Sequence, residues 1–271
     1  LKEINKKPIE KPGILDKQEA EKIFSNLENA DWKINSIEAK DKKRRPSPPF
    51  TTSTLQQAAW NAYKFSAKRT MISAQQLYEG IDLKSHGRVG LITYMRTDSF
   101  NLSEESLVLA REFLSENFGK NYALNEPRRF KTKSKSAQEA HEAIRPTHVS
   151  LVPEKIKENL TPEQFKIYKL IWQRFLATQM PEAVFEETTV NILANQKESR
   201  ENYLFESKGL VLKFDGFLKI YPLKLEGAET ILPALSEKDK IEAEEINIKS
   251  HETKPPARFN EASLIKALEK Y

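Results

Sequence analysis

The segment Gly90-Leu-Ile-Thr-Tyr-Met-Arg-Thr-Asp-Ser99 is the stretch around which the rest of this chain is organised. If the segment is extended, alternate side chains share a face, so Tyr94, Arg96 and Asp98 point the same way. Ile92 is predicted on that face as well. A phenol, a guanidinium and a carboxylate at alternate positions are not typical of a core. A tyrosine in a strand is nevertheless structural in roughly nine of ten cases, because its ring packs and its hydroxyl meets water. Spacing alone therefore gives only a candidate site.

Composition indicates a folded protein without cysteine chemistry or a membrane span. The 271 residues are 38% hydrophobic and 31% charged, with 14 Phe, 8 Tyr and 3 Trp, and this length favours two domains. The absence of Cys excludes disulfides, thiolate nucleophiles and cysteine-ligated zinc. No apolar run approaches the roughly 20 residues of a membrane span, and the polar start is not a signal peptide. We therefore expect a cytoplasmic protein with no membrane partner.

Two basic runs stand out against a modest excess of positive charge. Lys and Arg outnumber Asp and Glu by 44 to 39, which gives a formal net charge of +5. The runs are residues 40–45 (KDKKRR) and residues 128–135 (RRFKTKSK). Such runs can track a phosphate backbone, but they also occur as solvated loops. The sequence leaves both interpretations open.

The pattern of apolar residues divides the chain into β-rich and helical parts. Residues 46–50 contain three prolines and mark a boundary. Thr54 and Gln57 form a capping-box pattern that opens a helix after this boundary. Helical periodicity predicts helices at residues 16–29, 54–62, 67–79, 103–119 and 161–180, and alternation predicts strands at residues 32–37, 184–193, 203–206, 210–214, 217–221 and 241–248.

These elements predict an α+β multidomain architecture. A β-rich domain comprises residues 1–53 and 181–254, and a mainly α-helical domain carrying Tyr94 is inserted at residues 54–180. Residues 255–271 are predicted to begin a further helical domain. Because the chain ends inside a helical pattern and does not begin with Met, we expect it to be a piece of a longer protein.

Five stretches match one protein family in that family's order. Residues 91–99 resemble the active-site signature of the type IA DNA topoisomerases, and the match is best to the bacterial topoisomerase I branch. Five ordered matches are far more specific than any one alone. The other four stretches are Thr52-Ser-Thr-Leu-Gln-Gln-Ala58, Ala74-Gln-Gln-Leu-Tyr-Glu79, Ala140-His-Glu-Ala-Ile-Arg-Pro-Thr147 and Pro255-Pro-Ala-Arg-Phe-Asn-Glu-Ala-Ser-Leu-Ile265.

The resemblance implies that Tyr94 is a nucleophile that cleaves one DNA strand. The family forms a 5′-phosphotyrosyl link, allows strand passage and reseals the break, which relaxes negative supercoils without ATP. A phenol with a pKa of about 10 is a good leaving group on the return step, so the bond energy is conserved. The resemblance makes Arg96 the second catalytic residue, since its guanidinium can offer two donors to the charged phosphate.

Other matched positions are implied to contact DNA. His141 lies in one of the motifs, although a lone histidine is more often structural. Arg145 flanks it and is expected either to orient it or to bind the DNA backbone. Gln75 and Glu79 lie one helical turn apart and match positions that line the family's site, and Asp98 is assigned on the same basis.

The resemblance also implies a magnesium-dependent enzyme whose metal ligands lie outside this chain. The family carries an acidic domain before this region in the same polypeptide. The present sequence has no Asp-x-Asp pair and no pair of histidines at metal-ligand spacing, so we expect no metal bound here. We expect this piece alone to be inactive in relaxation. The implied partner is a single-stranded segment of underwound DNA in the bacterial nucleoid.

Two other functions fit some of the same residues. Tyrosine recombinases also use Tyr, Arg and His, but there the nucleophile follows the other two in sequence, whereas Tyr94 precedes both Arg96 and His141. A basic single-strand-binding module with an incidental tyrosine is the non-enzymatic alternative.

Overall fold

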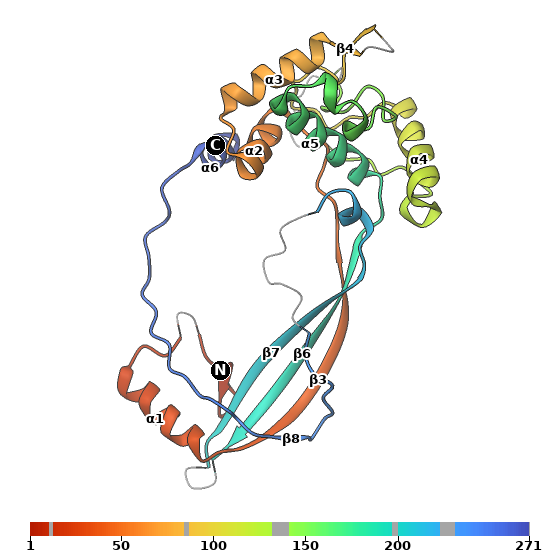
Figure 1. The fold of residues 1–271 in the computed structure, drawn as a ribbon. Helices are drawn as coiled ribbons and strands as arrows, with labels where there is room; N and C mark the ends of the chain where they lie inside the picture. Colours follow the sequence, from red (N-terminus) through yellow and green to blue (C-terminus); the bar gives the residue numbers. More distant parts are fainter. Residues whose placement is uncertain (11–12, 84–86, 132–140, 197–199, 223–230, 271) are drawn as a thin grey trace. The chain divides into compact units, whose positions relative to one another are not determined.

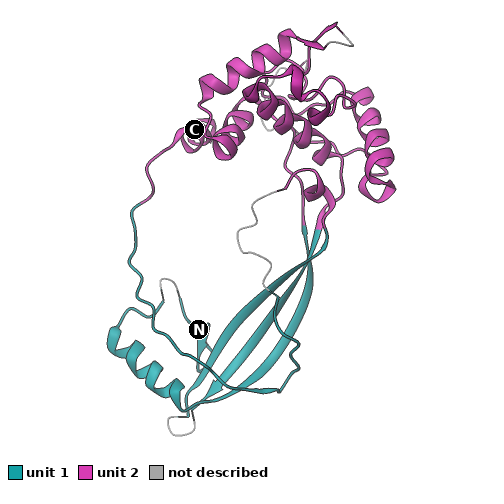
Figure 2. Ribbon diagram, viewed as in Figure 1, with its two compact units in different colours: residues 1–43, 184–214, 225–255 teal, residues 44–183, 215–224, 256–271 magenta. Residues whose placement is uncertain are grey.

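The computed structural model describes residues 1–271 apart from 11–12, 84–86, 132–140, 197–199, 223–230 and 271. The chain divides into two compact units, each assembled from separate pieces of sequence (Figure 2). Unit 1 comprises Leu1–Lys43, Val184–Phe214 and Leu225–Pro255, and unit 2 comprises Arg44–Ala183, Asp215–Lys224 and Pro256–Tyr271. The predicted combination of helices and sheet is confirmed. Unit 2 also takes in residues 44–53, 181–183, 215–224 and 256–271, which the sequence assigned elsewhere.

Unit 1 is built on one sheet (Figure 1). Among the described residues, its strand order is β2-β1-β7-β6-β3-β8. β6 and β7 pair antiparallel along their whole length, with Val190 opposite Ser207. The strands are β1 (Glu3–Ile4), β2 (Lys7–Pro8), β3 (Asp31–Arg44), β6 (Ala183–Asn195), β7 (Asn202–Phe214) and β8 (Lys240–Ile241).

Helix α1 (Lys17–Glu28) provides the apolar core of unit 1. Its buried Ile23 and Leu27 pack with Tyr203 of β7. The hydroxyl of Tyr203 donates a hydrogen bond to Glu201 and accepts one from the amide of Asn26 at 2.8 Å. Burial, with the neighbouring Glu201 carboxylate, raises the pKa of Tyr203 to about 12. Tyr203 therefore serves as a structural tyrosine that ties α1 to the sheet.

Strand predictions were wrong at three places in the chain. The separate strands expected at residues 203–206 and 210–214 are one strand, β7, because Gly209 continues the pairing opposite Thr188. Residues 217–221 do not form a strand, since Gly216–Lys219 forms the 3₁₀ helix η4. Of the strand expected at residues 241–248, only β8 (Lys240–Ile241) forms.

The first basic run lies mostly on β3 and is largely occupied by ion pairs. Lys42 Nζ is 2.8 Å from Glu187 Oε2 on β6, and Lys40 Nζ is 2.8 Å from Glu38 Oε2. Asp41, the acid within the run, pairs with Lys213 of β7 at 3.2 Å. Exposed ion pairs contribute little stability individually. They do neutralise the charge of the run, which favours a structural role over phosphate tracking.

Unit 2 is a helical unit centred on α5 (Pro162–Thr178) (Figure 1). The side chains of Ile167, Tyr168 and Ile171 in α5 are completely buried. Trp172 packs edge-on against Phe113 of α4, with ring centroids 5.7 Å apart. The described elements around α5 are α2 (Thr52–Tyr63), α3 (Ala67–Glu79), β4 (Ile81–Leu83), β5 (Gly87–Val89), α4 (Glu104–Phe118), η1 (Lys120–Tyr122), η2 (Pro153–Lys155), η3 (Lys157–Asn159), η4 and α6 (Glu261–Lys270).

Helix α6 packs against α2 within unit 2. Glu261, at the start of α6, accepts a hydrogen bond from the Ala67 backbone N–H at 2.7 Å. Glu269, near the end of α6, accepts one from the Ser53 hydroxyl at 2.7 Å. Residues 256–271 are therefore attached to the helical unit rather than separate from it. Whether they also begin a further domain stays a prediction.

Gly216 occupies a position in unit 2 that excludes a side chain. Its φ is +49°, and a Cβ placed there would lie 2.5 Å from the carbonyl oxygen of Glu182 and 2.6 Å from that of Pro181. We expect Gly216→Ala to lower the free energy of unfolding by about 3 kcal/mol. The loss would come from backbone strain at residue 216 and from displacement of the backbone at Pro181 and Glu182. Urea denaturation followed by circular dichroism measures the change.

The matched control is Gly119→Ala. Gly119 also has a positive φ, +94°, but a Cβ there meets nothing within 4 Å. Only the conformational cost of about 1 kcal/mol applies at that position. Equal losses of stability in the two variants would contradict the close backbone approach at Gly216.

Candidate active site

The segment 90–99 is held between two other parts of unit 2. The Leu91 N–H donates a hydrogen bond to the carbonyl of Leu77, near the end of α3, at 2.7 Å. The Thr93 N–H donates one to the carbonyl of Arg145 at 3.0 Å. An isolated antiparallel bridge links Ile92 with Pro146. The segment is thus an irregular stretch, with bends at Thr93, Met95 and Arg96, and not a strand of a sheet.

In the second half of the segment, exposed and buried residues alternate as predicted. Tyr94, Arg96 and Asp98 are exposed, and Tyr94 retains 42% of its accessible surface. The intervening residues Met95, Thr97 and Ser99 are buried. The prediction was wrong for Ile92, which is 1% exposed and lies in the core. Because this residue pairs with Pro146, it does not share the exposed face of Tyr94.

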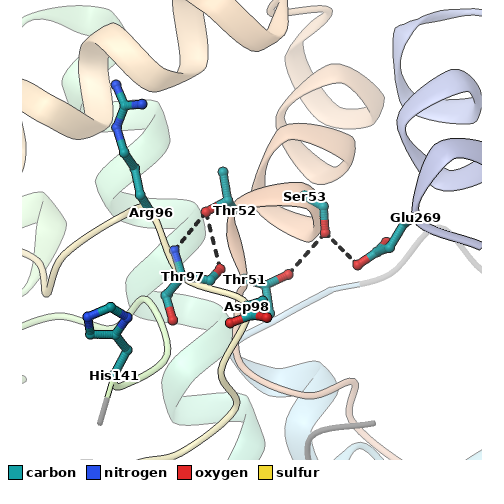
Figure 3. Close-up of a pocket in the computed structure, with 8 residues that line it drawn as sticks. All are labelled: Thr51, Thr52, Ser53, Arg96, Thr97, Asp98, His141 and Glu269. Carbon is teal, nitrogen blue, oxygen red and sulfur yellow. Dashed lines mark hydrogen bonds between the residues drawn. The ribbon is translucent and has the colours of Figure 1, made fainter. Parts of the chain in front are cut away.

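The N-terminus of α2 joins this segment on its other side (Figure 3). The Thr52 N–H donates to the Thr97 carbonyl, and the Thr97 N–H donates to the Thr52 hydroxyl, both at 2.9 Å. The Thr52 hydroxyl also donates to the Met95 carbonyl at 2.8 Å. Helix α2 begins at Thr52, with Thr51 and Thr54 forming the capping box. The predicted box with Gln57 was therefore wrong.

A polar pocket of about 570 Å³ lies where these elements meet. Arg96, Asp98 and His141, all predicted from the sequence, line it together. Figure 3 shows His141 and Glu269 on opposite sides of the pocket, with the side chain of Arg96 extending away from Asp98. The remaining lining residues are Thr51, Thr52, Ser53 and Thr97. Arg96 and the N-terminus of a helix suit an anion, whereas Asp98 and Glu269 add two carboxylates to the same lining.

The ring of Tyr94 stands beside this pocket between two other rings. Its centroid lies 6.2 Å from that of His141, which lines the pocket, and 5.4 Å from that of Tyr78 on α3. Two other tyrosines of unit 2, Tyr122 and Tyr168, are held by hydrogen bonds. The Tyr168 hydroxyl donates to the Leu151 carbonyl at 2.7 Å, and burial raises the pKa of Tyr168 above its usual range. The exposed phenol of Tyr94 is instead accessible to a ligand.

The remaining predicted residues lie outside the pocket. Gln75 and Glu79 are bonded to each other along α3, with Nε2 to Oε1 at 2.6 Å. Arg145 is largely buried, with 14% of its side chain exposed. Its guanidinium donates to Glu142 at 2.7 Å and to the Pro146 carbonyl at 3.0 Å. Arg145 therefore braces the loop that carries His141, which is one of the two roles expected from its position.

Five lining residues were not selected from the sequence, among them Thr97, which lies in the quoted segment but was expected on its opposite face. Thr51, Thr52 and Ser53 lie at the start of α2. The motif quoted at residues 52–58 contains Thr52 and Ser53 and could have indicated these two. Glu269 comes from α6, and its carboxylate accepts from Ser53 and, at 3.4 Å, from Gln57. No sequence signal marked it, because the contact joins residues 216 positions apart.

The second basic run contributes structural contacts in its described part. Arg128 donates to the carbonyls of Thr178 and Met180 at the end of α5, both at 2.8 Å. Burial lowers the pKa of Arg128. Arg129 makes a two-point ion pair with Glu104. Residues 132–135 lie outside the described part of the chain.

Neither a metal site nor a membrane span is found among the described residues. No group of three or more His, Cys, Asp or Glu side chains there could hold a metal ion. In the same part of the chain, no helix has the length and apolar character needed to cross a membrane.

Comparisons with known proteins agree over almost the whole chain. A family model described as DNA topoisomerase matches residues 2–271. DNA topoisomerase 1 of Rickettsia felis is 40% identical over 99% of this chain, and that of Helicobacter pylori is 44% identical over 94%. The structure of full-length topoisomerase I from Thermotoga maritima matches with a TM-score of 0.79 and 34% identity, covering 97% of this chain and 41% of that one. The chain spans 34% of the length of these two relatives.

Proposed function

Because this chain belongs to the bacterial type IA DNA topoisomerase family, we propose that it supplies the nucleophile and the anion-binding part of a DNA-cleaving site. The intact enzyme would cut one strand, pass another through the break and reseal it, relaxing negative supercoils without ATP. The observation that carries this proposal is the exposed Tyr94 phenol beside His141, at a pocket that also contains Arg96. The DNA partner would be a single-stranded segment of underwound duplex in the bacterial cytoplasm.

The proposed reaction begins with attack by the Tyr94 oxygen on a DNA phosphorus. A bond forms between the phenol oxygen and phosphorus, and the bond from phosphorus to the 3′ oxygen breaks. The phenolic proton is lost and the departing 3′ oxygen takes up a proton, so charge balances over the step. The product is a 5′-phosphotyrosyl ester. Because a phenolate with a pKa near 10 leaves readily, the 3′ hydroxyl can reverse the reaction without another energy source.

Arg96 would stabilise the charge that develops on the phosphoryl oxygens. Its guanidinium carries donors in a planar fork that matches two phosphate oxygens. His141, whose ring lies beside that of Tyr94, would contact the same DNA segment. The N-terminus of α2 at Thr52 and Ser53 opens onto the same pocket, and the Ser53 hydroxyl would turn from Glu269 to a neighbouring phosphate.

The other matched residues would act at the margins of this site. Asp98 lines the pocket as a carboxylate and would repel a phosphate, which restricts where the backbone can lie. Gln75 and Glu79 would contact DNA from α3, where they already bond each other. Arg145 would act indirectly, by holding the His141 loop through Glu142.

Magnesium would enter through a different part of the intact enzyme. The family is expected to hold Mg²⁺ in an acidic domain, and the described residues of this chain do not offer a comparable cluster. The residues here therefore do not fit the metal, and the steps above do not use it. The acidic domain of the same polypeptide is the proposed partner of this chain.

We expect this chain alone not to relax DNA. Incubation with negatively supercoiled plasmid and Mg²⁺, followed by agarose electrophoresis, should leave the topoisomers unchanged, because phosphoryl transfer depends on charge neutralisation that the acidic domain would supply. An intact relative such as the Helicobacter pylori enzyme is the positive control. Ladders of relaxed plasmid with this chain alone would contradict the expectation.

The proposed function itself is tested by trapping the DNA adduct. The intact enzyme is incubated with a labelled single-stranded oligonucleotide and denatured, and the label is followed on a protein gel. A labelled band that depends on Tyr94 supports the proposal. Salt-sensitive binding without an adduct would instead favour a single-strand-binding module.

A further inference from the structure

Tyr78 is an aromatic residue beside the proposed nucleophile to which no role has been given. It lies in the last turn of α3, and 42% of it is exposed. Its ring meets the ring of Tyr94 edge-on, with centroids 5.4 Å apart and an interplanar angle of 65°. With His141 at 6.2 Å, the phenol of Tyr94 stands between two rings.

The backbone at Tyr78 also lies close to the start of the segment that carries Tyr94. A Cβ on Gly90 would lie 2.8 Å from the carbonyl oxygen of Tyr78, so only glycine allows the two chains to approach this closely. The next residue, Leu91, donates its N–H to the Leu77 carbonyl at 2.7 Å. The end of α3 and the start of the segment bearing Tyr94 are therefore held together by a hydrogen bond at Leu77, the residue next to Tyr78. This docking of the two backbones favours the ring contact between Tyr78 and Tyr94.

We propose that Tyr78 is a positioning residue that orients the Tyr94 phenol for attack on the phosphate. The proposal rests on the proposed function of Tyr94. An exposed tyrosine has several side-chain orientations open to it, and in-line attack needs only one. The Tyr78 ring blocks rotation of Tyr94 towards α3, while the Tyr78 hydroxyl takes no part. Tyr78 should therefore affect the rate of cleavage and leave DNA affinity unchanged.

The test compares Tyr78→Phe with Tyr78→Leu in the intact enzyme. The rate of adduct formation is measured in single-turnover experiments with a labelled oligonucleotide, and the Kd is measured separately by fluorescence anisotropy. We expect Tyr78→Leu to slow adduct formation about tenfold with Kd within about twofold of wild type. Tyr78→Phe, which keeps the ring, should restore the rate to within about twofold. Ile72→Ala, at another exposed position of α3, is the control.

Three outcomes would overturn the proposal. A wild-type rate in Tyr78→Leu would show that the ring contact is not needed, and an equally slow Tyr78→Phe would assign the effect to the hydroxyl. A parallel weakening of Kd would make Tyr78 a DNA contact. If Tyr94→Phe still formed an adduct, the proposed function would fail instead, so the two failures are distinguishable.

A second measurement detects positioning without catalysis. In the present chain carrying ¹³C-labelled tyrosine, the ring signal of Tyr94 is assigned by its loss in Tyr94→Phe. Tyr78→Leu should shift that signal, because the neighbouring ring current is lost, and should narrow it, because the restriction on rotation is removed. Tyr78→Phe should shift it much less. An unchanged Tyr94 signal in Tyr78→Leu would contradict the proposed restriction.

Discussion

Tyr94→Phe is expected to abolish formation of the covalent protein–DNA adduct. The substitution removes only the phenolic oxygen and keeps the ring that packs between Tyr78 and His141. Without that oxygen no phosphotyrosyl bond can form, so the loss should reach the detection limit of the assay. Single-strand affinity should change little, because the ring and the neighbouring Arg96 remain. Adduct formation is measured on denaturing gels, and affinity by anisotropy.

The position of the label identifies the chemistry. A 5′-phosphotyrosyl enzyme retains the part of the strand that carries the 3′ end, so a 3′-end label should migrate with the protein and a 5′-end label should not. The opposite result would indicate a 3′-phosphotyrosyl link, which the proposed reaction does not form. Tyr122→Phe is a suitable control, since this tyrosine bonds Asp215 at 2.8 Å and lies outside the pocket. An adduct that survived in Tyr94→Phe would remove this residue from the mechanism.

Local patterns predicted much of the helical unit but less of the sheet. The positions of α3, α4 and α5 follow from capping residues and apolar periodicity, which act within one element. Long β3 was underestimated because its basic half has no apolar alternation. That half is held by partners far away in sequence, such as Glu187 for Lys42. Pairing over such separations is not visible in a local pattern.

The candidate site was likewise predicted only where it depends on local sequence. The alternation of Tyr94, Arg96 and Asp98 could be predicted because it depends only on the backbone of one segment. The motifs indicated His141, but spacing could not distinguish a DNA contact from a brace at Arg145, whose burial depends on the fold around it. Glu269 was missed because only the packing of α6 against α2 brings its carboxylate to Ser53.

Arg96→Ala is expected to slow DNA cleavage by about 10²- to 10³-fold. That is the usual effect of removing one preorganised donor from a site where oxyanion charge develops. The exposed guanidinium of Arg96 lines the pocket. After its removal, His141 would be the remaining basic side chain among the lining residues. The measurement is the single-turnover rate of adduct formation at saturating oligonucleotide. Arg111→Ala is the matched control, because Arg111 is exposed on α4 and donates to the Asn125 carbonyl at 3.1 Å.

Arg96→Lys separates charge from geometry. Lysine keeps the positive charge but loses the planar fork, so the rate should fall between those of wild type and Arg96→Ala. Binding gives an independent measure: loss of one phosphate contact should reduce the slope of log K against log salt by about 1 in Arg96→Ala, and the slope should be preserved in Arg96→Lys. A wild-type cleavage rate in Arg96→Ala would exclude this residue from the reacting phosphate. A reduced slope with an unchanged rate would place Arg96 on a flanking phosphate instead, because only a donor at the reacting phosphate contributes more to the transition state than to the bound DNA.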